Sequence, residues 1–157
     1  MKNVDFARNL VKGKIAETVF AQMLRETEKF TVLEFGYEKV IPELVQHGYD
    51  QKSGILETLR SAPDFAVINQ QTKKVHLIEV KYLRNMNSHY VSKYAQRMAK
   101  SWNPSHLFVA TLKGFFFGEV NEIVGNNGAI DPLHHSQISD ELQIKYLKIL
   151  QDFEGSN

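Results

Sequence analysis

Three charged residues, Asp64, Glu79 and Lys81, lie at spacings that would let them act together. Glu79 and Lys81 are two positions apart in the β-rich run 75–82, so on a strand their side chains share one face while Val80 points to the other. Asp64 opens the preceding β-rich run, and a polar connector between the two runs predicts a β-hairpin. Antiparallel pairing can bring the start of the first strand beside the end of the second. The sequence therefore predicts that these three side chains lie close together in the folded protein.

The chemistry of this group is that of a divalent cation site. Two carboxylates a few ångströms apart raise each other's pKa unless a cation shares their site, and their hard oxygens suit Mg²⁺ or Mn²⁺. An ammonium beside such a metal positions water or neutralises charge that develops on a phosphate. The neighbours Leu77, Ile78 and Val80 are apolar, and charges among them are costly without a ligand. The alternative interpretation is a strand end that emerges into solvent with an ordinary surface Glu and Lys.

A further carboxyl group, Glu17, belongs to the segment from Val4 to about Glu28, whose Ala, Leu, Lys and Glu content predicts a helix. On a helical wheel Glu17 falls within the apolar stripe formed by Leu10, Phe20, Ala21 and Leu24. A carboxylate that points with the apolar stripe needs a partner. The alternative is a glutamate at the edge of the stripe that reaches solvent or pairs with Lys14.

The net charge of +1, from 19 basic and 18 acidic residues, argues at first against a nucleic-acid partner. The charges are nevertheless segregated along the chain: residues 80–118 carry six basic and no acidic side chains, and residues 119–157 carry two basic and seven acidic ones. The segment from Tyr90 to Trp102 lies in the basic block and has apolar residues at helical spacing, which predicts an amphipathic helix. Its outer face carries polar and basic residues suited to a phosphate backbone, namely Lys93, Gln96, Arg97 and Lys100. An ordinary solvated face is the alternative.

The remaining patterns predict a strand over Phe30–Ile41, an ambiguous stretch over 43–62 with a short helical turn near Ile55–Leu59, and two more strands over 106–112 and 115–120. A loop over 125–132 precedes a final helix from about Ser139 to Phe153. The resulting order predicts an α/β protein with a mixed sheet covered by helices on both faces. With 157 residues and no linker, we expect one domain, with its core at about 5–120 and a C-terminal strand, loop and helix extension over 121–157.

The run Ser61-Ala62-Pro63-Asp64, followed by a strand, a polar turn and Leu77-Ile78-Glu79-Val80-Lys81, resembles the PD-(D/E)xK motif of the restriction-endonuclease-like nuclease superfamily. The helix-strand-strand-strand-helix-strand order (α-β-β-β-α-β) is similar to the core of that superfamily. Gly13-Lys14-Ile15-Ala16-Glu17 resembles its helical glutamate, particularly in small Holliday-junction resolvases. The resemblance covers roughly residues 5–120.

The resemblance implies a metal-dependent endonuclease that hydrolyses phosphodiester bonds in DNA, with branched or otherwise structured DNA as one expected substrate class. Asp64, Glu79 and the Val80 main-chain carbonyl would ligate Mg²⁺, or Mn²⁺ in its place. Lys81 would orient or help to deprotonate the attacking water, and Glu17 would complete the acidic cluster directly or through water. Lys93, Gln96, Arg97 and Lys100 would contact DNA. By the same resemblance we expect a homodimer, for which Phe115-Phe116-Phe117 is a candidate interface or a buried strand.

Two other functional classes stay open. One is a catalytically inactive nucleic-acid-binding or assembly module on the same fold, and the other is an α/β protein in which Glu79 and Lys81 are a surface coincidence. Gln96 is followed four residues later by Lys100 where some exonuclease branches have a Tyr, so an end-processing exonuclease of that kind is not supported.

Several other classes lack a basis in the sequence. The absence of cysteine excludes disulfides, a thiolate zinc site and a cysteine nucleophile. No glycine-rich phosphate loop is present, so we expect no nucleotide cofactor. The adjacent His134 and His135 indicate a polar surface loop, and His76 and His106 indicate strand residues. The N-terminus carries charges where a signal peptide needs an apolar run, and no stretch approaches the ~18 apolar residues of a membrane span. We therefore expect a cytoplasmic protein without membrane contact.

Overall fold

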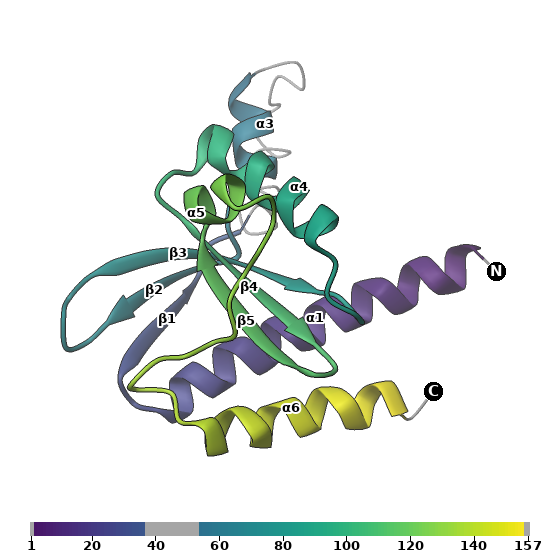
Figure 1. Ribbon diagram of the computed structural model, residues 1–157, viewed down its shortest axis with the longest axis vertical. Helices are drawn as coiled ribbons and strands as arrows, with labels where there is room; N and C mark the ends of the chain where they lie inside the picture. Colours follow the sequence, from purple (N-terminus) through teal and green to yellow (C-terminus); the bar gives the residue numbers. More distant parts are fainter. Residues whose placement is uncertain (1, 37–53, 156–157) are drawn as a thin grey trace, which may run out of the picture.

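The computed structural model describes residues 2–36 and 54–155. The elements follow in chain order (Figure 1) as α1 (Lys2–Glu26), β1 (Phe30–Glu34), α3 (Gly54–Arg60), β2 (Phe65–Asn69), β3 (Val75–Tyr82), α4 (Ser88–Ser101), β4 (His106–Thr111), β5 (Gly114–Glu119), α5 (Val120–Gly125) and α6 (Asp140–Gly155).

The five strands form one mixed sheet in the order β1-β2-β3-β4-β5. The pairs β1–β2, β2–β3 and β4–β5 are antiparallel, and β3 and β4 are parallel. The parallel pair requires a crossover, which α4 supplies. The α/β class, the mixed sheet and the hairpin formed by β2 and β3 are thus confirmed.

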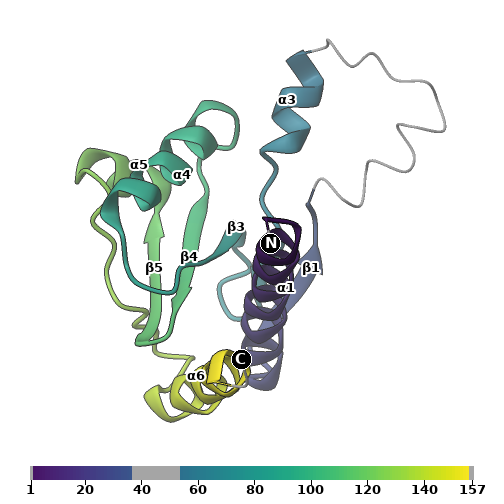
Figure 2. The ribbon, with the colours of Figure 1, turned by 90° about the vertical axis from the view of Figure 1, so that its right-hand side faces the viewer.

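Helices cover both faces of the sheet, as the alternation of apolar side chains along the strands requires. On one face α1 and α6 lie side by side (Figures 1 and 2), and Phe20 of α1 packs on Phe65 and Phe108 with ring centroids 5.3 and 4.8 Å apart. On the other face α4 and α5 pack against alternate residues of β4, Leu107 and Val109. The two helix pairs enclose two separate hydrophobic cores.

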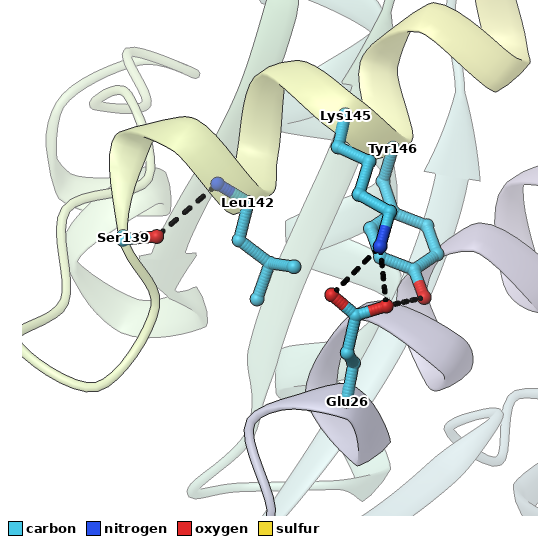
Figure 3. Close-up of polar contacts among 5 residues, drawn as sticks. All are labelled: Glu26, Ser139, Leu142, Lys145 and Tyr146. Atoms are coloured by element: carbon cyan, nitrogen blue, oxygen red, sulfur yellow. Dashed lines mark hydrogen bonds and ion pairs between the residues drawn. The ribbon is translucent and has the colours of Figure 1, made fainter.

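Residues at the start and in the middle of α6 fix its position (Figure 3). The Ser139 hydroxyl accepts a hydrogen bond from the Leu142 N–H at 3.1 Å, which caps the helix near the predicted start. The Glu26 carboxylate at the end of α1 accepts hydrogen bonds from the Lys145 ammonium at 2.9 Å and the Tyr146 hydroxyl at 2.9 Å. The acidic C-terminal segment is therefore docked along α1.

The main departures from the predicted elements are local. β1 ends at Glu34, and the part of the predicted strand beyond Gly36 lies outside the described residues, as does the predicted stretch 43–53. The helical turn near 55–59 is confirmed as α3. Val120, predicted to end a strand, instead begins α5, because Val120 and Ile123 are buried against α4. Among the described residues after 120 there is no strand, so the predicted C-terminal strand was wrong; Pro132 forms only a single bridge to Phe116.

Candidate active site

A cleft of about 660 Å³ opens beside α1 where β3 ends and β2 begins. Its walls come from α1, the end of β1, the residues before β2 and the second half of β3. Five residues predicted from the sequence line it together: Glu17, Asp64, Glu79, Val80 and Lys81. Three segments that are far apart in the sequence therefore meet in one hollow.

The strand register places Asp64 beside Glu79. Phe65 pairs with Ile78 across β2 and β3, so the residue before Phe65 lies opposite the residue after Ile78. The Val80 N–H donates a hydrogen bond to Asp64 Oδ2 at 2.8 Å, which ties the carboxyl group directly to β3. Val80 itself is buried in the core against α1, as the alternation predicted.

The main chain around Asp64 is also held by the end of β1. The Asp64 carbonyl accepts hydrogen bonds from the Phe35 N–H at 2.9 Å and the Gly36 N–H at 3.4 Å. These bonds continue the pairing of β1 with β2 for two residues beyond the strand itself. Asp64 is thus fixed from both neighbouring strands, which is the rigidity that a catalytic carboxylate requires.

The electrostatics of the cleft centre on Asp64. Burial raises the pKa of its carboxyl group to about 8, assisted by a hydrogen bond with Glu79 and by the charge of Glu79. The Val80 N–H and a hydrogen bond with Glu17 act in the opposite direction but are weaker. At neutral pH the acidic cluster therefore retains a proton, and a bound cation would favour its release.

Lys81 lies close to this cluster. Its ammonium nitrogen is 3.8 Å from Glu79 Oε2 and 4.8 Å from the centroid of the Tyr94 ring of α4. The Glu79 side chain is only 14% exposed and that of Lys81 is 34% exposed. These two residues are therefore partly buried, which is unlike an ordinary exposed pair at the end of a strand.

Glu17 forms an ion pair with Lys14 and also lies beside Asp64 in the cleft. It pairs with Lys14 at 3.5 Å, as the alternative interpretation stated, and its side chain is 24% exposed. It also lines the cleft and shares a hydrogen bond with Asp64. The ion pair with Lys14 thus coexists with a place in the acidic cluster.

The predicted DNA-contacting residues lie elsewhere. Lys93, Gln96, Arg97 and Lys100 are all exposed on α4, which confirms the polar outer face of that helix. None of them lines the cleft, so the structure does not bring them to the acidic cluster.

Two basic residues of α1 that the sequence analysis did not place in the site also line the cleft, Lys14 and Arg25. Both lie on the helix face of Glu17, at spacings of three and eight residues, so a helical wheel drawn around Glu17 could have found them. Arg25 also donates a hydrogen bond to the Val32 carbonyl of β1 at 3.2 Å. The cleft therefore contains three cations, counting Lys81, beside its carboxylates.

The oxygen donors suit a hard divalent cation, because they are carboxylate groups placed around Asp64, whose pKa is raised by burial and by the neighbouring Glu79. Within the described residues, however, no group of three or more His, Cys, Asp or Glu side chains is arranged to hold a metal ion. Mg²⁺ commonly keeps several waters and binds through one or two carboxylates.

Comparisons with known proteins assign no family. No model of a known protein family matches the sequence, and a search of curated proteins finds no significant match. Among the described helices, none combines the length and apolar character needed to cross a membrane.

Proposed function

We propose that this protein is a metal-dependent DNA endonuclease with its active site in the cleft around Asp64. The observation that carries the proposal is the convergence of Glu17, Asp64, Glu79 and Lys81 from separate segments on one cleft. The proposal includes the PD-(D/E)xK motif and the restriction-endonuclease-like core that the sequence resembles.

In this proposal Asp64 and Glu79 hold Mg²⁺, with Glu17 close enough to contribute directly or through water. When bound, the ion would polarise the scissile phosphate and lower the pKa of the attacking water. Lys81, whose ammonium group lies near Glu79 and the Tyr94 ring, would orient that water and help it to lose its proton by stabilising the negative charge that forms.

The basic residues would position the substrate. Lys14 and Arg25 line the cleft beside the carboxylates, where they would neutralise the phosphates that flank the scissile one. The exposed Lys93 and Arg97 of α4 would contact the backbone farther along the DNA. We also propose that the protein acts as a homodimer, which sedimentation of the purified protein would test.

A nuclease assay tests the proposal. Supercoiled, linear, single-stranded and four-way-junction DNA would each be incubated with the protein in Mg²⁺ or Mn²⁺, with and without a chelator. We expect cleavage that the chelator abolishes and that Asp64→Asn or Lys81→Ala lowers about a hundredfold or more. The matched control is Asp131→Asn, an exposed aspartate outside the cleft, which should leave cleavage unchanged. Cleavage that survives either cleft substitution contradicts the assignment.

A binding or assembly module is the second candidate, favoured by the exposed basic face of α4 and by the lack of a three-ligand metal group in the described residues. Saturable DNA binding without cleavage by the intact protein, under every metal condition, would select this candidate.

A further inference from the structure

Phe35 is an exposed aromatic residue at the edge of the cleft around Asp64. It follows the last residue of β1, lines the cleft and keeps 36% of its surface exposed. The proposed nuclease chemistry uses the carboxylates and Lys81 and gives this ring no role. Single apolar side chains are common on protein surfaces, so exposure alone indicates nothing. Phe35 is distinguished by where its side chain lies and by how firmly it is held.

The strand register puts Phe35 in one cross-strand row with two carboxyl groups of the acidic cluster. The Phe35 N–H donates to the Asp64 carbonyl at 2.9 Å and continues the pairing of β1 with β2, so these two residues lie opposite each other. Asp64 lies opposite Glu79 by the pairing of β2 with β3. Residues directly opposite on neighbouring strands present their side chains on the same face, with Cβ atoms about 5 Å apart. The row therefore joins an aromatic ring to the two proposed metal ligands, and all three residues line the cleft.

Contacts on both the side chain and the main chain hold Phe35 in place. The ring of Trp102, which follows α4, lies against the Phe35 ring with centroids 5.4 Å apart and planes at 83°, a favourable edge-to-face arrangement. The Trp102 indole N–H donates in turn to the Thr58 carbonyl of α3 at 2.8 Å. A ring that is already fixed loses little further freedom when a flat group stacks on it. Phe35 is therefore suited to act as a stacking platform.

The charges that line the cleft are nearly balanced. Its three basic residues, Lys14, Arg25 and Lys81, face four carboxyl residues, of which Asp64 keeps its proton at neutral pH because burial raises its pKa to about 8. Phosphate groups are then neither strongly attracted nor strongly repelled. Electrostatic attraction within the cleft alone does not hold a polyanion, so a nucleic acid needs a further contact.

A nucleobase can supply that contact. Stacking on aromatic side chains is a main source of affinity in proteins that bind single strands, because every base has an aromatic face. In a duplex the faces of a base are covered by its neighbours, so a paired base must first be unstacked to reach a side chain in a cleft. An aromatic ring beside the acidic cluster therefore favours DNA whose bases are unpaired there.

We propose that the cleft takes an unpaired nucleotide, whose base stacks on Phe35 while its phosphate lies toward Asp64 and Glu79. Phe35 is then the residue that selects unpaired DNA, which occurs in single strands, flaps and branch points, over continuous duplex. The inference rests on the proposed function for the identity of the ligand as DNA, and it adds the specificity of the same site.

Binding measured in a chelator tests the inference without hydrolysis, because the proposed chemistry needs a metal ion. Fluorescence anisotropy at pH 7 would compare a labelled oligothymidylate with a blunt duplex of equal length. We expect binding of the single strand to be tighter by about tenfold or more, and Phe35→Leu should weaken it about tenfold without changing duplex binding. Phe35→Trp keeps an aromatic face and should retain the preference. The matched control is Phe6→Leu, an exposed phenylalanine of α1 outside the cleft lining, which should bind like the wild type.

Two further readouts locate the contact. Trp102 is the single tryptophan of the chain and lies against Phe35, so its emission should change when the single strand binds. Stacking on Phe35 neutralises no phosphate, so Phe35→Leu should weaken binding by the same factor at low and high salt.

Several results would overturn the inference: no binding of the single strand, equal or tighter binding of the duplex, normal single-strand binding by Phe35→Leu, or the same loss in Phe6→Leu. Single-strand binding without a change in Trp102 emission would place the contact elsewhere and overturn it as well. The wild-type comparison decides the matter even if Phe35→Leu does not fold.

The outcomes separate this inference from the proposed function. Metal-dependent cleavage that is equal for single strands and duplex, and that Phe35→Leu leaves unchanged, would overturn the inference and leave the proposed function standing. Phe35-dependent binding of single strands by a protein that cleaves no DNA would support the inference and contradict the proposed function.

Discussion

Replacing Asp64 by Asn should make the folded protein more stable at alkaline pH, although it removes a proposed metal ligand. The Asn side chain is nearly isosteric and keeps an oxygen that can accept the Val80 N–H. It cannot ionise, so it avoids the cost of a buried charge beside Glu79. A gain in stability would show that the Asp64 carboxyl group does not stabilise the fold at alkaline pH. A loss of stability would show that it does.

The magnitude follows from the pKa of Asp64, which rises from 3.8 to about 8 on folding. Between these values the folded state keeps a proton that the unfolded state releases, so stability decreases as the pH rises. A shift of about 4 units corresponds to an upper limit on the order of 5 kcal/mol. Because Glu79 shares the proton with Asp64, we expect a gain of about 2 kcal/mol for Asp64→Asn at pH 9 and a smaller gain at pH 5.

Urea unfolding followed by circular dichroism would measure this difference at both pH values, with Asp131→Asn as the exposed control. Adding Mg²⁺ at pH 9 should stabilise the wild-type protein but not Asp64→Asn, because ligand binding to the folded state adds to its stability. If Asp64→Asn is no more stable than the wild type at pH 9, or if its gain is the same at pH 5, the account of the acidic cluster is wrong.

Three further predictions concern the scaffold. Glu154→Gln should destabilise the protein by about 1–3 kcal/mol in urea unfolding. The reason is that the Glu154 carboxylate is mostly buried and pairs with Lys12 of α1 at 3.1 Å and with the Tyr82 hydroxyl of β3. Glu26→Gln, at the more exposed ion pair in Figure 3, should have a smaller effect. Because burial lowers the pKa of His76 and His106 from 6.5, stability should decrease as the pH falls below 6.5, and double replacement by Phe should flatten this dependence in thermal unfolding. Gly128→Ala should lower the melting temperature and reduce the free energy of unfolding by roughly 2 kcal/mol or more. The φ of Gly128 is +91°, and a Cβ atom there would lie 2.0 Å from the Ser88 carbonyl oxygen of α4. An unchanged melting temperature would contradict the close packing of this loop.

Local patterns predicted most elements because they depend on residues close in the sequence. The alternation in β3 placed Val80 in the core and left Glu79 and Lys81 on the opposite face, and the spacing in α4 separated its buried and basic sides. α5 was missed because its six residues are too few to show a helical period. The helical form of residues 120–125 depends on their burial against α4, and the sequence around them does not indicate that contact.

The sequence by itself determined that Glu79 and Lys81 would share a strand face and that α1, α4 and α6 would form helices. The tertiary structure alone decided that Glu17 reaches Asp64, that Lys14 and Arg25 share their cleft, and that the basic face of α4 lies apart from it. It also brought His76, His106 and His135 to the wall of one cavity. The physical reason is the sequence distance over which the interactions act. The periodicity of apolar residues depends on neighbouring residues. The distances between elements, and the burial that raises the pKa of Asp64, depend on the packing of the whole chain.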